Sequence, residues 1–299
     1  MPRAPGSRQR SVAFLARIPT RPRRRINLAA DEPYVSGRGS LTAHLYTGRV
    51  GSRTYRTEAV VLRSLRFGEA DRILHLFTKE RGRVGAIAKG ARRARSRFGG
   101  RLEPFSRVDL QLHEGRGELA TVTGVDLLRS HQSLATDTYL VAVGSIGLEA
   151  MLRLFVEHDA SPRAYHALAR FLELLDGGAP PATRASEPAL DPLVLGFQLK
   201  LLWLAGYLPH LGSCAECGAE DPLVAFSAAQ GGGVCRQCGA GAIPLSPSGF
   251  LGVRGLLERP LAGAHEVELE QKGARETLRV IEALYEYHGG FRLRTLAAG

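Results

Sequence analysis

Long apolar runs are missing from this chain of 299 residues, and so are the short motifs of most enzymes. We find no run of 18 or more apolar residues without a charge or a helix breaker, which argues against a membrane-spanning helix. The dipeptide Gly-Lys does not occur, so the chain has no phosphate-binding P-loop. It also lacks G-x-S-x-G, H-E-x-x-H and a dinucleotide-binding glycine fingerprint, and its nine histidines are scattered. With no candidate catalytic residues, we expect a protein that is not an enzyme.

Acidic residues are scarce in the first half of the chain. The whole sequence has 40 Lys and Arg against 29 Asp and Glu, a net charge of +11. Residues 1–53 contribute +9 and residues 54–130 contribute +7, whereas residues 131–299 carry −5. This asymmetry is typical of a protein whose first half meets nucleic acid.

Residues 1–53 have no sustained helical or strand-like apolar period and are rich in Arg, Pro, Gly and Ser. We expect a disordered Arg-rich tail there, or residues that are not translated, with Val50 as an alternative start. An organelle-targeting peptide is the minor alternative, because the stretch is Arg-rich and acid-poor.

Short alternating runs separated by turn residues follow the tail. We expect five strands at Tyr55–Arg63, Ile73–Phe77, Arg83–Ala88, Arg107–Leu112 and Glu118–Val125. Five short strands within about 75 residues favour a small barrel or a sandwich, and periodicity alone does not separate the two.

After residue 130 the apolar period becomes helical, so we expect a helical domain over residues 131–299. Three helix starts combine a capping oxygen with proline at the next position: Ser161-Pro162, Asp191-Pro192 and Ser246-Pro247. A last helix over about 274–288 should end at Gly289-Gly290, and residues 177–190 should form an exposed loop.

All four cysteines belong to one pattern, Cys214-x2-Cys217 and Cys235-x2-Cys238. Two such knuckles bring four thiolates around one tetrahedral ion, most often Zn2+, and four thiolates close its coordination sphere. We therefore expect a structural zinc module at about 212–242, inserted between helices, with a small hairpin between the knuckles. Glycine follows each knuckle, at Gly218 and Gly239, where the turn often needs a positive φ.

Three other roles for the cysteines fit the sequence less well. A disulfide pair would need an oxidising compartment, and no secretory signal precedes the cysteines. A dithiol redox centre leaves the second knuckle unexplained. A zinc deaminase needs an H-x-E sequence, which is absent.

The densest positive charge outside the tail lies between residues 81 and 107, with Glu103 as its only acidic residue. We expect a mobile Gly/Arg loop here that binds phosphates, with aromatic side chains that stack on bases. The alternative is a solvated basic loop with Phe105 in the core. The candidate nucleic-acid-binding residues are Arg81, Arg83, Lys89, Arg92, Arg93, Arg95, Arg97, Phe98 and Arg101.

Several segments together resemble the bacterial RecO family of recombination mediators. They are the GEADRIL and KGARR…LEPF segments of residues 55–106, and GYLPHLGSCAECG joined to the second C-x-x-C. The resemblance covers about residues 54–296. It implies an α+β fold: an N-terminal five-stranded OB-fold barrel over 54–130, then a helical domain that carries a four-cysteine zinc ribbon. Gln198 departs from the Glu expected before the first knuckle.

The resemblance also implies an ATP-independent function in DNA repair and recombination. Such proteins bind single- and double-stranded DNA and anneal strands coated with single-strand-binding protein. They also join a RecR partner to load recombinase, in the bacterial cytoplasm at the nucleoid. Arg153, Arg170 and Lys200 are candidate contacts for the acidic, apolar C-terminal tail of the single-strand-binding protein. The resemblance places the four cysteines as ligands of one Zn2+.

Two other functions remain open from the residues alone. A zinc-ribbon protein that binds RNA would share the basic barrel and the knuckles. A protein-only adaptor would carry the basic stretch merely as solvated charge.

Overall fold

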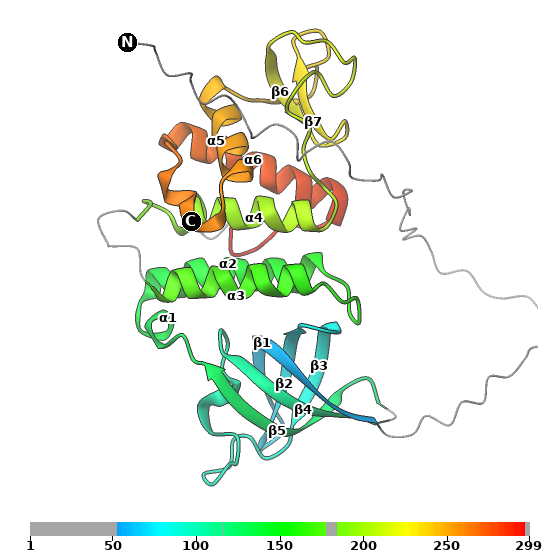
Figure 1. Cartoon of the computed structure of the whole chain (residues 1–299), viewed down its shortest axis with the longest axis vertical. Helices are drawn as coiled ribbons and strands as arrows, with labels where there is room; N and C mark the ends of the chain where they lie inside the picture. The colour runs from blue at the N-terminus through cyan, green and yellow to red at the C-terminus, as the bar shows by residue number, and fades with distance from the viewer. Residues whose placement is uncertain (1–52, 116, 178–183, 297–299) are drawn as a thin grey trace, which may run out of the picture. The chain divides into compact units, whose positions relative to one another are not determined.

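The computed structural model describes residues 53–115, 117–177 and 184–296. The five N-terminal strands are β1 (Arg53–Phe67), β2 (Asp71–Thr78), β3 (Gly82–Ala88), β4 (Arg107–Glu114) and β5 (Ala120–Arg129). The helices are α1 (Gln132–Thr136), α2 (Thr138–Leu154), α3 (Pro162–Asp176), α4 (Pro192–Leu204), α5 (Pro247–Glu258) and α6 (Gln271–Leu284). Three short strands, β6 (Leu223–Ser227), β7 (Gly232–Cys235) and β8 (Ile243–Pro244), lie between α4 and α5 (Figure 1). The expected α+β class is confirmed.

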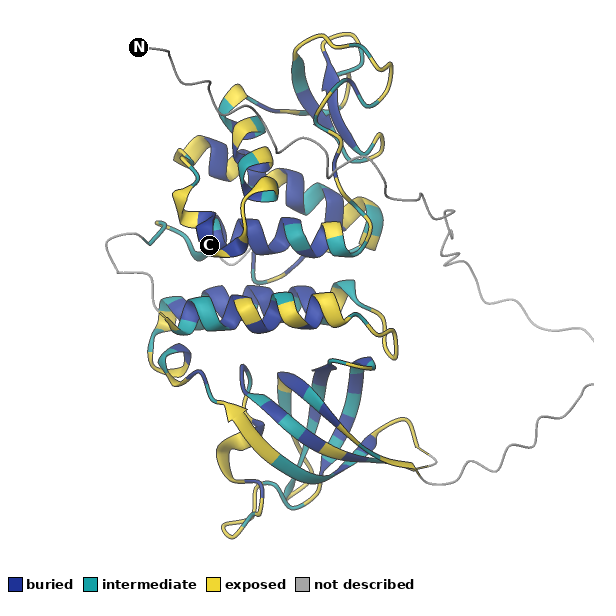
Figure 2. Cartoon of the chain, viewed as in Figure 1, coloured by how far each residue is buried: buried dark blue, intermediate teal, exposed yellow. Residues whose placement is uncertain are grey.

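The five N-terminal strands close into a barrel in the order β1-β2-β3-β5-β4. All neighbouring pairs are antiparallel except β3 and β5, whose parallel pairing closes the ring. Strand alternation fills the interior with small and branched side chains, among them Val61, Leu74 and Leu110, each fully buried (Figure 2). Alternation along β1 serves two cores, with Ala59 and Val61 in the barrel and Val60 and Leu62 against the helices, and a bulge follows between Val61 and Arg63.

Helices α3, α4 and α5 begin at the residues that the sequence predicts. Ser161 accepts a hydrogen bond from the Ala164 amide, Asp191 from the Leu193 amide and Ser246 from the Gly249 amide, each with proline at the first turn. The last helix runs through α6 into a π-helical turn and ends at Gly290, whose φ of 67° lies in the left-handed region.

Barrel and helices share a seam of apolar and charged contacts. Val60, Leu62 and Phe77 of the barrel belong to the same apolar cluster as the helices. The Phe77 ring meets Phe155 edge to face at 5.4 Å, and the Tyr165 hydroxyl donates to the Glu58 carboxylate at 3.0 Å. The barrel is therefore fixed to α2 and α3.

Two expectations about the fold need correction. The first strand runs four residues beyond the expected end at Arg63, because its C-terminal part pairs with β2 out to Asp71. The loop expected at 177–190 is not exposed at its C-terminal end, where Pro188–Leu190 forms a 3-10 turn that buries Ala189 and Leu190. The expectation for residues 1–53 lies outside the described residues, apart from Arg53 in β1.

Within the residues that the structure describes, no helix combines the length and the apolar character needed to cross a bilayer.

Candidate nucleic-acid interface and metal centre

The basic loop connects β3 to β4 and spans residues 89–106. Its C-terminal half is anchored in the barrel: Phe98 and Leu102 are buried in the barrel core, and Gly99–Leu102 forms a 3-10 turn. Its N-terminal half is tied to the β1–β2 hairpin, since the Arg92 amide donates to the Ala70 carbonyl at 2.8 Å. The cations between these anchors therefore project from a fixed frame.

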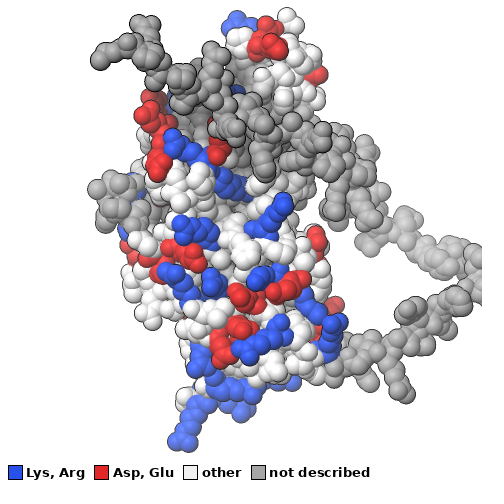
Figure 3. All heavy atoms as spheres, viewed as in Figure 1, with Lys and Arg blue, Asp and Glu red and all other residues white. Residues whose placement is uncertain are grey.

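Six cations of this loop are exposed, and among the described residues no carboxylate comes within 4.0 Å of their charged nitrogens. They are Lys89, Arg92, Arg93, Arg95, Arg97 and Arg101. Figure 3 shows blue side chains gathered at the lower end of the view, beyond the barrel. Guanidinium groups without carboxylate partners can bind phosphates without first breaking an ion pair.

The two remaining cations of the predicted set lie elsewhere. Arg83 on β3 donates to the Leu152 carbonyl, to the Phe155 carbonyl at 3.1 Å and to Glu157 at 2.8 Å, so it ties the barrel to the end of α2. Arg81 pairs with Glu114 at 2.7 Å and lies 3.8 Å from the Tyr55 ring centroid. The structure does not bring these two arginines to the basic loop.

Phe98 also differs from its expected role. The ring is only 1% exposed in the barrel core, and the Arg97 guanidinium lies 4.9 Å from its centroid. A side chain held in this way cannot stack on a base without leaving the core. A different aromatic residue, Phe67, is 51% exposed at the end of β1 and is absent from the expected set. An aromatic residue directly before the turn glycine Gly68 was the available signal.

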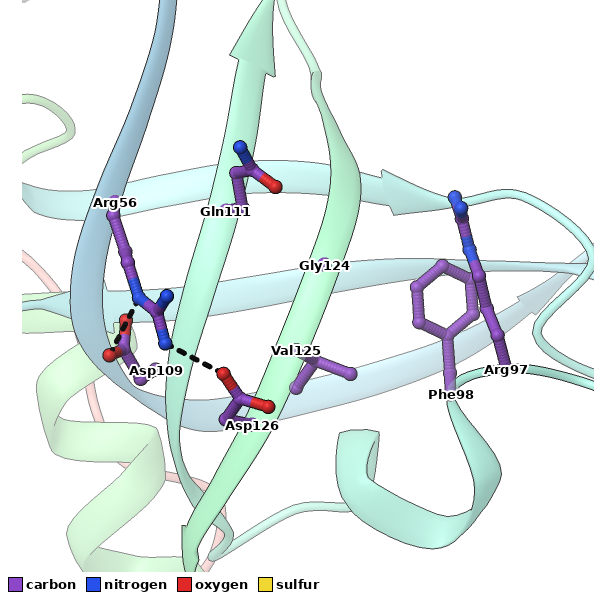
Figure 4. A pocket seen from close by; sticks show the side chains of 8 residues that line it. All are labelled: Arg56, Arg97, Phe98, Asp109, Gln111, Gly124, Val125 and Asp126. Atoms are coloured by element: carbon purple, nitrogen blue, oxygen red, sulfur yellow. Dashed lines mark hydrogen bonds and ion pairs between the residues drawn. The ribbon is translucent and has the colours of Figure 1, made fainter.

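A pocket of about 280 Å³ lies on the β1–β4–β5 side of the barrel (Figure 4). Arg56 reaches across it to Asp109 at 2.9 Å and to Asp126 at 2.6 Å, while Arg97 stands at its other side. A phosphate entering here would meet two guanidinium groups and two carboxylates, so the lining has no excess of positive charge. The pocket therefore does not favour an anion.

The four cysteines and the strands β6 to β8 form a small unit between α4 and α5, which we call the thiolate module. Its three-stranded sheet has the order β7-β6-β8, with the β6–β7 hairpin expected from the sequence. The first knuckle turns at Gly218, whose φ is +74° and whose amide donates to the Cys214 carbonyl at 2.9 Å. The expectation for Gly239 is wrong, because in the second knuckle the positive φ falls at Gly241, with a value of 75°.

The four cysteine sulfurs all lie within 4.8 Å of one another. The Sγ atoms of Cys217 and Cys235 are 3.9 Å apart, close to the roughly 3.8 Å edge of a tetrahedron with Zn–S bonds of about 2.3 Å. Backbone amides of Cys217 and Cys235 lower the pKa of Cys214 to about 6, whereas hydrogen bonding to Cys217 and desolvation raise the pKa of Cys238. Cys214 therefore ionises readily, whereas ionising Cys238 beside it is unfavourable. A bound divalent cation would offset the repulsion between the thiolates. The donor set fits Zn2+.

The three candidate partner-binding cations lie on three different helices. Arg153, at the end of α2, is exposed and stacks 5.2 Å from the Phe291 ring centroid. Arg170 on α3 is exposed beside Glu173 at 3.5 Å. Lys200 on α4 donates to the Leu257 carbonyl at 3.3 Å, and desolvation lowers its pKa. Only Arg153 places an exposed charge beside an aromatic ring.

Together, the fold and the sites define an α+β chain in which a β-barrel with an exposed basic loop is joined to a helical part with a four-thiolate cluster. Family comparisons match both parts of the described chain. Residues 52–131 match the model "Recombination protein O N terminal", and residues 135–297 match "Recombination protein O C terminal". The chain belongs to the recombination protein O (RecO) family.

Similar proteins bear the same name. A protein of Rubrobacter xylanophilus named "DNA repair protein RecO" is 41% identical over 233 residues, which cover 75% of this chain and 88% of that protein. The DNA repair protein RecO of Nocardioides sp. is 39% identical over 249 residues, 81% of this chain and 98% of that protein. The one of Anaeromyxobacter sp. strain K is 35% identical over 241 residues, 78% of this chain and 91% of that protein.

Proposed function

We propose that this chain is an ATP-independent, non-enzymatic DNA-binding mediator of recombinational repair. It binds single- and double-stranded DNA, anneals complementary strands coated with single-strand-binding protein and, with a RecR partner, helps to load recombinase. Membership in a family whose relatives are named DNA repair proteins supports the role in DNA repair and recombination. DNA as the substrate implies that the protein acts at the bacterial nucleoid in the cytoplasm.

The observation that carries this proposal is the set of exposed cations on the loop between β3 and β4, which have no carboxylate partner in the described part of the chain. Annealing needs a surface that neutralises the phosphates of two strands while leaving their bases free to pair. The strand order and the parallel closure by β3 and β5 fit an OB-fold, a barrel that commonly holds single strands. A loop on such a barrel neutralises backbones without reading sequence.

The helical part supplies the proposed protein contacts. Arg153 beside Phe291 is the best candidate for the acidic, apolar tail of the single-strand-binding protein, because it combines a cation with an aromatic surface. The four cysteines would hold one structural Zn2+, which ties the two knuckles of the β6–β8 sheet together. In this role the ion supplies cohesion, and the residues that contact DNA remain on the barrel.

The direct experiment is annealing of two complementary oligonucleotides, each precoated with the cognate single-strand-binding protein, by the full chain without nucleotide. We expect rapid annealing that a DNA competitor suppresses more strongly than an RNA competitor of the same sequence. Absence of annealing would overturn the mediator function. Stronger suppression by RNA would favour the RNA-binding alternative.

A further inference from the structure

Phe67 is an exposed aromatic residue that belongs to none of the apolar clusters formed by the described residues. Its side chain is 51% exposed at the last position of β1. Among the strongly exposed aromatic side chains of the described residues, it alone lies on the barrel, since Trp203 and Tyr287 belong to the helical part. A single exposed ring is common on protein surfaces, so Phe67 marks a binding site only if it is part of a larger apolar patch with suitable charges beside it.

The hairpin that carries Phe67 is tied to the basic loop by three hydrogen bonds. The Arg92 amide donates to the Ala70 carbonyl at 2.8 Å, and the Arg92 guanidinium donates to the Gly68 carbonyl at 3.1 Å. The Gly90 amide donates to the Asp71 carboxylate at 2.7 Å. The hairpin end that carries Phe67 is therefore held next to the loop cations, and the Asp71 carboxylate is used in that connection.

The register of the barrel puts further apolar side chains on the same face. Phe67 pairs with Asp71 and Leu65 pairs with Ile73, which in turn pairs with Ile87 on β3. Directly paired residues share a face, and alternation places these side chains outside because Leu74 points into the core. Leu65, Ile73 and Ile87 are all half-buried. They form an apolar strip across the outer face of β1, β2 and β3.

Cations border this strip on two sides. Arg63, two positions before Leu65 on β1, is exposed, and Lys89 directly follows β3. Within the described part of the chain, neither lies within 4.0 Å of a carboxylate. His75 lies on the same face, and its pKa is lowered first by desolvation and then by the charges of Arg63 and Arg83, against the opposing charge of Glu157. Two carboxylates lie near these cations at the hairpin turn: the exposed Glu69, and Asp71, which pairs with Phe67 and accepts the Gly90 amide.

We propose that Phe67 is a stacking platform for an unpaired base, with the Leu65–Ile73–Ile87 strip as its apolar floor and Arg63 and Lys89 as contacts for the flanking phosphates. This inference rests on the proposed function and deepens it, because it assigns the contact with an unpaired base to one side chain. Bases in a duplex are already stacked on one another and do not offer a face to Phe67. The ligand is a single-stranded oligonucleotide without a required sequence.

The experiment compares the full chain with its Phe67→Ala and Phe67→Trp variants, with Leu128→Ala as control. Leu128 is 44% exposed on β5 and belongs to neither the strip nor the loop. The probes are an oligothymidylate, the same strand with abasic sites, and a duplex of equal length. We expect Phe67→Ala to weaken oligothymidylate binding roughly 5- to 100-fold, the range for one or more lost base stacks. Duplex affinity and the salt slope should not change, because no phosphate contact is lost.

Two further readouts separate stacking from a loss of shape. Phe67→Trp should retain binding, and its added indole fluorescence should be quenched by the oligothymidylate but not by the duplex. Abasic sites in the oligothymidylate should weaken its binding to the unmodified chain but should weaken its binding to Phe67→Ala little further. Unchanged oligothymidylate affinity in Phe67→Ala would overturn the inference, while DNA binding by the unmodified chain would leave the proposed function intact. No binding of any DNA by the unmodified chain would overturn both.

Discussion

The barrel and the thiolate module are both small β-structures, but different forces hold them together. The barrel encloses a cluster of fourteen buried side chains, contributed by all five strands and the basic loop. The corresponding cluster in the module has four buried members within the described chain, and two of them are cysteines. A three-stranded sheet of this size cannot bury enough apolar surface to fold alone. The module therefore depends on its sulfurs and on Phe226 of β6, which is fully buried in the core of the helical part, whereas the barrel has a core of its own.

This difference determines where each region can carry function. Because the core and the seam with α2 and α3 stabilise the barrel, its loop can leave six cations unpaired at little cost in stability. The module has no such freedom, since its knuckle backbones are directed at the sulfurs: the Cys235 amide donates to the Cys214 sulfur at 3.4 Å. Binding residues are thus expected on the barrel and structural residues in the module.

The largest expected effect comes from removing metal ligands. Replacing Cys214 and Cys235, which are 2% and 1% exposed, with Ser should abolish metal binding and unfold the β6–β8 sheet. Structural zinc supplies on the order of 10 kcal/mol to the folding of a small module. Metal content and amide hydrogen exchange of β6 and β7 check this, while the barrel amides should remain protected.

The control for that experiment is Arg236→Ser, which changes an exposed non-ligand residue of the second knuckle. It should keep both metal and protection. A metal-free double variant with the exchange pattern of the unmodified chain would show that the module does not depend on its sulfurs.

The next largest effect is a loss of DNA affinity that leaves the stability of the fold unchanged. Replacing Arg92, Arg93, Arg95 and Arg97 with Ala should flatten the salt dependence of single-strand binding by about 0.7 per lost phosphate contact, on the order of 100-fold in affinity near physiological salt. Thermal unfolding should change little, because these side chains are exposed. The matched control removes four exposed cations of the helical part and the module, Arg163, Arg236, Lys272 and Arg279. Equal losses in both variants would mean that net charge, and not the loop, drives binding.

Sequence patterns predict those features that local chemistry decides. The three Ser/Asp-Pro helix starts, the five strands and the proximity of the four cysteines all follow from neighbours in the chain. The partners of individual arginines do not, since Arg83 meets carbonyls 69 and 72 residues away. Burial of Phe98 was missed for the same reason. An aromatic residue within a basic run reads as exposed until the barrel closes around it.

A smaller effect is expected from removing a contact between the barrel and the end of α2. Arg83→Met keeps an unbranched apolar stem but removes the donors to two carbonyls at the end of α2 and the ion pair with Glu157. We expect a loss of about 2 kcal/mol in unfolding free energy, measured by denaturant unfolding, with Arg93→Met within about 0.5 kcal/mol of the unmodified chain. The salt slope of DNA binding should not change in Arg83→Met. A flatter slope would return Arg83 to the DNA-binding set.

The smallest expected effect separates backbone strain from ligation inside the module. Gly218 has a φ of +74°, and a Cβ placed there would meet no heavy atom within 4 Å. The cost of Gly218→Ala is therefore backbone strain alone, roughly 1 to 2 kcal/mol, whereas Gly218→Asn should cost less because Asn tolerates this conformation. All four sulfurs remain in both variants, so each should bind one equivalent of metal, with faster release to a competing chelator in the Ala variant. Equal release rates in the two variants would show that the knuckle relaxes its backbone and that the sulfurs alone hold it, which would sharpen the contrast with the barrel further.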